Sequence, residues 1–200
     1  GGSKVKDKIG VIDRLLERVD HLLLGGGLAN TFLRASGYDV GASFYEENCV
    51  DLAKRFMKLA EERGVKLQIP TDVVVAEKIA PDAATRVVPV EAIPPGYQGL
   101  DIGPETARRY GEIIRSSRMV IWNGPMGVFE EPPFAKGTFE LAKAMAECDG
   151  ITIVGGGDSA AAMEQAGLSH RVTHVSTGAD TSYCDRGVCG FARTPVGNFR

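Results

Sequence analysis

Two glycine triplets, each placed between an apolar strand-like run and a helix-like run, constrain the fold of this chain most. Gly25-Gly26-Gly27 lies within HLLLGGGLANTFLRA, and Gly155-Gly156-Gly157 lies within ITIVGGGDSAAAMEQ. A strand that ends in glycines and opens a helix gathers bare backbone N–H groups at the positive end of that helix, where phosphate commonly binds. Two such turns in one small domain predict a ligand with several negative groups, such as a nucleotide.

Length and charge argue against several classes of protein. The 200 residues suffice for one domain with a sizeable core. With 23 basic and 26 acidic residues and no basic block interleaved with aromatics, the chain lacks the features of a nucleic-acid-binding protein. No apolar run is long enough to span a membrane, and no secretion signal opens the chain. We therefore expect a cytoplasmic protein with reduced cysteines.

Strand-like and helix-like segments alternate along the chain. Helices are expected over 5–19, 28–36, 51–63, 105–116, 134–148 and 159–166, strands over 21–24, 66–69, 72–76, 87–90, 118–122, 151–154 and 172–175, and a turn over 94–99. The alternation predicts an α/β fold, a Rossmann-like three-layer α/β/α arrangement around a mainly parallel sheet. Ligands of such sheets bind beyond the carboxyl ends of the strands. Both triplets and the Asn123-Gly124-Pro125 turn should therefore share one rim.

Five collinear motifs resemble those of one enzyme family. They are GGSKVKDKIGVI at 1–12, LLLGGGLANTFL at 22–33, GLDIGPET at 99–106, VIWNGPMGVFE at 120–130 and TIVGGGDSAAA at 152–162. Together they resemble the nucleotide-binding, C-terminal half of phosphoglycerate kinase, from Gly1 to about Gly178. The resemblance implies a glycolytic transferase that moves phosphate between 1,3-bisphosphoglycerate and ADP, forming 3-phosphoglycerate and ATP, with Mg²⁺. It also implies that the full-length form is a monomer.

Lys4 and Lys8 are four residues apart at the opening of the first expected helix, a spacing that would project both ammonium groups from one face. Phosphoryl transfer depends on positioning and on charge neutralisation, which a lysine pair can supply. The resemblance implies that Lys4 is catalytic and faces the transferred group, and that Lys8 binds the nucleotide phosphates. By themselves, the residues favour a solvated helix face with Asp7 as a local partner of the lysines.

Asp158 and Ser159 directly follow the second triplet. A carboxylate there repels phosphate unless a cation lies between them, and Mg²⁺ is often held by one carboxylate together with phosphate oxygens. Aspartate and serine are also ordinary capping residues at a positive helix end, and the residues alone leave both interpretations open. The resemblance favours Asp158 as the metal ligand and assigns Gly155, Gly156, Gly157 and Ser159 to nucleotide binding.

Other nucleotide-binding residues are also implied by the resemblance. Gly25, Gly26 and Gly27 resemble the wall on the adenine side, where glycine allows a flat ring to approach, although a tight strand–helix turn would explain them as well. The nucleoside would pack on the loop that contains Asn123, Gly124, Pro125 and Gly127, and Glu130 would bind the ribose hydroxyls. Gly99 and Leu100 match a segment that closes over the base.

The chain departs from the family at both ends. The resemblance implies that a core strand and the whole 3-phosphoglycerate-binding half precede Gly1, so we expect nucleotide binding without turnover and a sheet that lacks one strand. After Gly178 the sequence has no helical period, and Ala179 and Asp180 stand where the family has glycines. A frame slip or a truncated gene model would produce such a tail. We therefore expect a nucleotide-binding domain over 1–178 and an irregular tail over 179–200.

Two other functions fit parts of the sequence. Gly155, Gly157 and Ala160 match a dinucleotide-binding fingerprint, and Asp180 lies about 20 residues further on, as in NAD-dependent dehydrogenases. This fingerprint lies so near the end of the chain that little sequence remains for the rest of that fold. A non-catalytic module that only binds a nucleotide is the other alternative. Binding of ATP rather than NAD would distinguish the kinase from the dehydrogenase.

Overall fold

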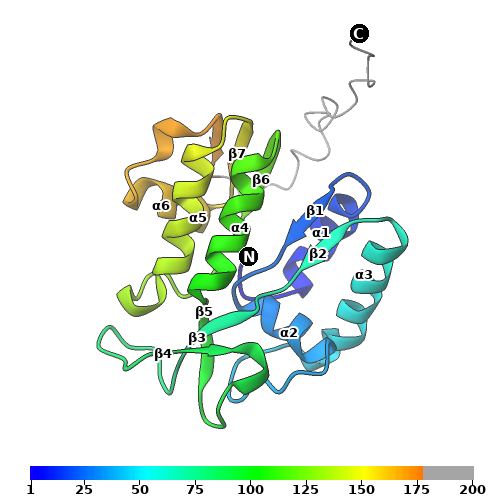
Figure 1. The fold of residues 1–200 in the computed structure, drawn as a ribbon, viewed down its shortest axis with the longest axis vertical. Helices are drawn as coiled ribbons and strands as arrows, with labels where there is room; N and C mark the ends of the chain where they lie inside the picture. Colours follow the sequence, from blue (N-terminus) through cyan, green and yellow to red (C-terminus); the bar gives the residue numbers. More distant parts are fainter. Residues whose placement is uncertain (178–200) are drawn as a thin grey trace.

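Helices and strands alternate along most of the chain, as Figure 1 shows for the computed structural model, in which residues 1–177 are described. The α-helices are α1 (Ile9–Leu15), α2 (Gly27–Ala35), α3 (Val50–Glu62), α4 (Pro104–Ser116), α5 (Lys136–Glu147) and α6 (Gly157–Gln165). The strands are β1 (His21–Leu23), β2 (Lys66–Gln68), β3 (Asp72–Ala76), β4 (Arg86–Pro89), β5 (Gln98–Ile102), β6 (Met119–Asn123), β7 (Ile151–Gly155) and β8 (His174–Ser176). The expected α/β class is confirmed.

The strands form three sheets. β1 pairs in parallel with β2, and β7 pairs in parallel with β6 on one side and with β8 on the other. β3 lies between β4 and β5 and runs antiparallel to both. The parallel pairing that the alternation predicted is therefore present, but it is divided between two sheets, and a small antiparallel sheet accompanies them.

Each parallel sheet has an apolar core that it shares with its own helices. Phe32 and Phe56 are buried where α1, α2 and α3 pack near β1 and β2. Tyr110 and Met145 are buried where α4, α5 and α6 pack near β6 and β7. Figure 1 shows these two units on either side of the molecule, with the antiparallel sheet below them. Each helix thus turns its apolar stripe toward its own sheet.

The start of α4 is fixed by a side chain from the antiparallel sheet. Asp72 on β3 accepts hydrogen bonds from the backbone N–H groups of Thr106 at 2.8 Å and Glu105 at 3.0 Å. Pro104 is in the first turn, where a missing N–H costs nothing. A Cβ at Gly103 would lie 2.2 Å from the Asp72 carboxyl carbon, so glycine is required there. Asp72 therefore acts as the N-terminal cap of α4.

An apolar cleft of about 240 Å³ lies between the two parallel sheets. Side chains from α1 (Val11, Ile12, Leu15), from β1 (Leu22, Leu23) and from β6 (Val120, Ile121, Trp122) are among those that line it. Within residues 1–177, β1 pairs only with β2 and β6 pairs only with β7. The edges that border the cleft therefore carry no neighbouring strand among the described residues.

Three segments differ from the sequence-based expectations. The helix expected over 5–19 is a 3₁₀ turn (Lys6–Lys8) followed by α1, with a break at Lys8, whose ψ is 2°. β5 includes part of the turn expected over 94–99, because antiparallel pairing with β3 overrides its low strand propensity. The last strand begins at His174 instead of at position 172. Gly178 and the tail over 179–200 lie outside the described residues.

Candidate functional site

The second glycine triplet forms an open helix start. β7 ends at Gly155, and Gly156, with a φ of 93°, turns the chain so that α6 begins at Gly157. Only glycine adopts such a φ without strain. No side chain caps α6, and a Cβ at Gly157 would meet no atom within 4 Å. Because the first N–H groups of a helix have no partner within it, this end offers open donors to a negative group.

A lysine and an asparagine lie beside this helix start. The Lys8 ammonium donates a hydrogen bond to Oδ1 of Asn123, the last residue of β6. A Cβ at Gly155 would lie 3.4 Å from Nδ2 of Asn123, so the Asn123 amide faces the triplet. Burial lowers the pKa of Lys8, and the charges of Asp7 and Asp158 oppose this shift. Lys8, Asn123 and Asp158 therefore lie near one another at the carboxyl ends of β6 and β7. This is the rim that the sequence predicted the second triplet and the Asn123 turn to share.

Ser159 and Gly124 bind each other. The fully buried Ser159 hydroxyl accepts a hydrogen bond from the Gly124 N–H at 2.7 Å. The Gly124 carbonyl accepts one from the indole N–H of Trp122, also at 2.7 Å, and Trp122 is buried in the core. A Cβ at Gly124 would lie 2.4 Å from backbone atoms of Gly1. These two predicted site residues thus fix the turn after β6 against the start of α6.

The first triplet packs against two other segments of the chain, the N-terminal residues and the loop after β6. The Gly26 N–H donates to the Met126 carbonyl at 2.9 Å, and the Leu28 N–H donates to the Gly2 carbonyl at 3.1 Å. A Cβ at Gly25 would lie 2.2 Å from the sulfur of Met126. These two donors at the start of α2 are already used, unlike those of α6. Close packing within the chain therefore accounts for these glycines as a tight turn between β1 and α2, and the used donors argue against a second phosphate site.

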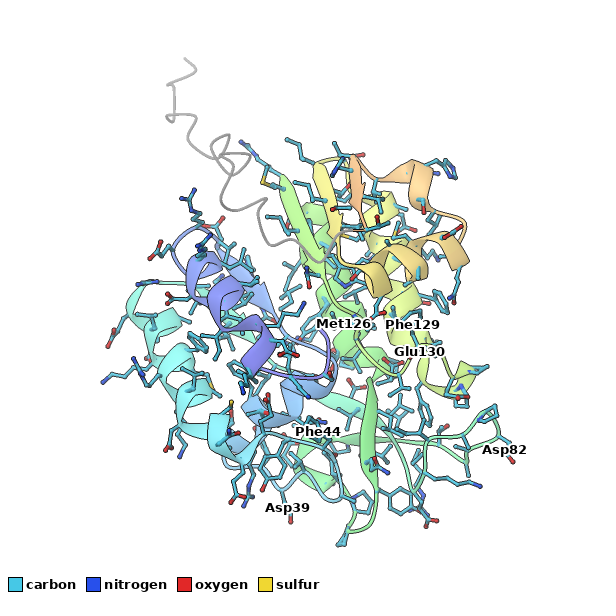
Figure 2. All side chains as sticks on the ribbon, turned by 180° about the vertical axis from the view of Figure 1, so that it is seen from behind. Asp39, Phe44, Asp82, Met126, Phe129 and Glu130 are labelled. Carbon is cyan, nitrogen blue, oxygen red and sulfur yellow. The ribbon has the colours of Figure 1, made fainter. Side chains whose placement is uncertain are left out.

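A cavity of about 380 Å³ brings together eight of the predicted residues. They are Gly26, Gly27, Gly99, Leu100, Pro125, Gly127, Glu130 and Asp158. Figure 2 labels Met126, Phe129 and Glu130 on the loop between β6 and α5, which we call the 124–131 loop. The cavity therefore extends from the first triplet, past β5 and this loop, to the first turn of α6.

Sequence and structure comparisons place this chain in a known family. A sequence model of the family described as phosphoglycerate kinase matches residues 1–183. The chain belongs to the phosphoglycerate kinase family. It is 56% identical over 182 residues to phosphoglycerate kinase of Roseiflexus castenholzii (strain DSM 13941 / HLO8), covering 91% of this chain and 46% of that relative. It is 58% identical over 182 residues to the enzyme of Roseiflexus sp. (strain RS-1), with the same coverage.

Solved structures of phosphoglycerate kinases share this fold. The structure from Coxiella burnetii superposes with a TM-score of 0.89 at 40% identity, over 92% of this chain and 48% of that one. The structure from Pyrococcus horikoshii OT3 gives a TM-score of 0.77 at 34% identity, over 92% and 47%. The chain thus spans about half the length of the phosphoglycerate kinases it matches, a family of glycolytic kinases.

The remaining predicted residues lie outside this cavity. Lys8, Asn123 and Gly155 line the end of the apolar cleft between the two sheets. Lys4 is exposed and lies between Ser3, which lines the cavity, and the 3₁₀ turn that carries Lys8. Lys4 and Lys8 are therefore near the same rim, but only Lys8 of the two has a hydrogen-bond partner among the described residues.

Two exposed apolar side chains of the cavity were missed by sequence reasoning. Phe44 and Ile79 both line it, although 53% and 50% of their surfaces are exposed. Figure 2 labels Phe44, which lies on the connection between α2 and α3. Neither residue belongs to a periodic apolar stripe, so the sequence pattern gives no reason to select them. Exposed apolar side chains beside glycine-lined walls suit a flat, weakly polar group.

The donor set also suits magnesium. Asp158 is exposed in the first turn of α6 and lines the cavity. Within the described part of the chain, no group of three or more His, Cys, Asp or Glu side chains is arranged to hold a metal. Mg²⁺ commonly takes one or two carboxylates and fills its other positions with water and substrate phosphates. A single carboxylate beside the open start of α6 therefore fits that ion.

Proposed function

We propose that this chain is the nucleotide-binding, C-terminal half of a phosphoglycerate kinase and that it binds ADP and ATP together with Mg²⁺. The observation that supports this most is the continuity between the open start of α6 and the cavity, since Asp158 belongs to both. A nucleotide has two matching parts, a row of phosphates and a flat base on a sugar. The polar end of the site suits the phosphates, and its apolar end suits the base.

The proposed roles follow this division. The phosphates lie at Gly155, Gly156, Gly157, Lys8 and Asn123, and the nucleoside lies against Gly25, Gly26, Gly27, Gly99, Leu100, Pro125 and Gly127. Glu130 is exposed at the cavity, where its carboxylate accepts hydrogen bonds from the ribose hydroxyls. Asp158 would hold Mg²⁺, which would neutralise part of the negative charge on the phosphate oxygens. Ser159 and Gly124 keep the two ends of the site in register through their 2.7 Å hydrogen bond.

The reaction transfers one phosphoryl group. An oxygen of the ADP β-phosphate forms a bond to the phosphorus of 1,3-bisphosphoglycerate, and the bond from that phosphorus to the acyl oxygen breaks, releasing 3-phosphoglycerate. Charge on the transferred group must be neutralised while it moves. Lys4 is exposed on the rim next to Lys8 and takes this role in our proposal. Because only charge and position are needed, no residue of this chain has to form a covalent intermediate.

The proposal includes a limit on activity. Holding two reactants in line contributes roughly 7–11 kcal/mol to lowering a barrier, and the relatives are about twice as long as this chain. We assign 3-phosphoglycerate binding to the other half of those proteins. A coupled assay with the 200-residue chain should therefore read background. Robust phosphorylation of ADP from 1,3-bisphosphoglycerate by the pure chain would contradict this assignment.

Replacing the proposed magnesium ligand tests the site itself. In calorimetry, Asp158→Ala should lose most of the gain in ADP affinity that Mg²⁺ gives the unchanged chain, while metal-free ADP binding stays nearly intact. Glu164→Ala is the matched control, because Glu164 is an exposed carboxylate on the same helix that does not line the cavity. An Asp158→Ala variant that keeps its full response to Mg²⁺ would exclude Asp158 as the ligand.

A dinucleotide-dependent dehydrogenase is the rival enzyme. Gly155, Gly157 and Ala160 keep their fingerprint positions around the start of α6, but Asp180 lies outside the described residues. The family match supports the kinase. A module that binds nucleotide without any catalytic role is the other alternative. Adding the half of the relatives that this chain does not match distinguishes the two, since only the kinase then gains turnover.

A further inference from the structure

Asp101 is a buried carboxylate at the start of α5. It lies on β5, and only 4% of its surface is exposed. Its Oδ2 accepts a hydrogen bond from the Gly137 N–H at 2.8 Å, and its Oδ1 accepts one from the Ile102 N–H at 2.9 Å. Gly137 is in the first turn of α5, whose own N-cap residue, Ala135, supplies no side-chain bond. Asp101 therefore caps α5 from another element.

Two glycines make room for this carboxylate. A Cβ at Gly137 would lie 2.4 Å from Oδ1 of Asp101, and a Cβ at Gly127 would lie 2.5 Å from the same oxygen. Gly127 belongs to the 124–131 loop, so the carboxylate is enclosed between that loop and the start of α5. Both positions exclude any larger residue unless Asp101 moves. The two glycines and the carboxylate thus form one close-packed unit.

Backbone hydrogen bonds connect this unit to the cavity. Thr138 follows Gly137 in α5, is fully buried, and accepts a hydrogen bond from the Met126 N–H at 3.0 Å. The Met126 carbonyl in turn accepts the 2.9 Å hydrogen bond from Gly26. The Val128 N–H donates to the carbonyl of Leu100, the residue before Asp101, at 2.9 Å. The position of the 124–131 loop against the first triplet therefore depends on where α5 starts.

We propose that Asp101 is a positioning residue of the nucleotide site, which fixes the start of α5 and thereby holds the 124–131 loop against the first glycine triplet. This inference rests on the proposed nucleotide binding. Although Asp101 borders the cavity, both of its oxygens accept backbone N–H groups, so it acts through the loop. The loop brings Pro125, Gly127 and Glu130 to the cavity, and their spacing is lost when the cap of α5 is lost.

Asp72 provides a matched control, because it caps α4 in the same way and does not line the cavity. Asp101→Ala and Asp72→Ala should both lower the melting temperature. Only Asp101→Ala should raise the Kd for MgADP in calorimetry, by at least about tenfold, the effect of roughly 1.4 kcal/mol. Asp101→Asn keeps one oxygen that can accept from Gly137 and should recover most of the affinity.

Amide hydrogen exchange gives a second readout that needs no nucleotide. Amide exchange at Met126, Val128 and Gly26 should be faster in Asp101→Ala than in the unchanged chain. The same amides should keep their exchange rates in Asp72→Ala. The measurement can also be made on an Asp101→Ala variant that is only partly folded. MgADP affinity of Asp101→Ala within about twofold of the unchanged chain, or equal losses in both alanine variants, would overturn the inference. An unchanged chain that does not bind MgADP would instead overturn the proposed function, and the positioning role with it.

Discussion

The hydroxyl of Ser159 accepts a 2.7 Å hydrogen bond from the backbone N–H of Gly124. Ser159 belongs to the first turn of α6, and Gly124 follows β6. This bond therefore joins a helix start to a loop 35 positions away in the sequence. Both groups are buried, which means that no water replaces either partner when the other is removed. The bond keeps the start of α6 and the 124–131 loop at a fixed distance.

Ser159→Ala leaves the Gly124 N–H buried without an acceptor. An unsatisfied buried donor costs on the order of 1–3 kcal/mol, so the free energy of unfolding should fall by about that amount. Urea denaturation monitored by Trp122 fluorescence measures it. Ser116→Ala is the control, because the Ser116 hydroxyl bonds Ile113 at the exposed end of α4. A loss no larger than in Ser116→Ala would show that the buried bond does not stabilise the chain.

Lys8→Met should separate affinity from stability. Burial lowers the pKa of Lys8 because the charged ammonium loses contact with water. This desolvation lowers the stability of the folded chain, and an uncharged methionine does not have it. The melting temperature should therefore stay level or rise, while the Kd for MgADP rises at least about tenfold because a phosphate partner is lost. Lys6→Met, in the same 3₁₀ turn and exposed, should change neither quantity. Unchanged affinity in Lys8→Met would remove Lys8 from the site.

Asp101 should make stability depend on pH in a defined direction. Burial raises the pKa of Asp101 from 3.8 to about 7, against two opposing backbone hydrogen bonds. Between those two values the folded chain keeps a proton that the unfolded chain has released, so this residue's contribution to stability falls as pH rises. Asp101→Asn cannot titrate. Its free energy of unfolding relative to the unchanged chain should therefore increase from pH 5 to pH 8, by on the order of 2 kcal/mol.

Chemical denaturation of both chains at several pH values measures this difference and cancels the contribution of other titrating groups. A constant difference between the two chains across this range would mean that Asp101 keeps an ordinary pKa in the folded state. The result bears on stability alone, so it is independent of whether Asp101→Asn restores nucleotide affinity.

An apolar strand of roughly 5–6 residues, a common strand length, should stabilise the chain when it is fused before Gly1. The cleft between β1 and β6 is lined by apolar side chains, and the strand edges beside it are unpaired within residues 1–177. The melting temperature should rise and self-association, which open strand edges promote, should decrease.

A polar segment of equal length is the control for this fusion, since it extends the chain equally but cannot fill an apolar cleft. Differential scanning calorimetry and sedimentation velocity measure the two effects. If the chain without the fusion is already monomeric and gains no more from the apolar strand than from the polar one, the cleft is not a place for a strand.

The sequence was sufficient to predict the parts of the site that depend on local geometry. The turn at Gly156 and the open start of α6 follow from glycines between a strand and a helix, and the structure has both. The same pattern at Gly26 did not reveal that its N–H binds Met126. That bond depends on a loop 100 positions away in the chain, which no local pattern encodes.

Other features depend on tertiary packing and were not predictable. Phe44 and Ile79 reach the cavity from irregular segments without apolar periodicity. Asp101 was part of a recognised motif, but its cap on Gly137 spans 36 positions and joins two elements. The α/β class was predictable because it follows from alternation, whereas the division into separate sheets depends on which strands the folded chain brings together.

Isothermal titration calorimetry of the unchanged chain with MgADP and with NAD tests the central claim most directly. The account predicts saturable heat with MgADP, weaker binding when Mg²⁺ is withdrawn, and no binding of NAD. Binding of NAD without binding of MgADP would contradict the assignment of the cavity and of the α6 start to a kinase nucleotide site.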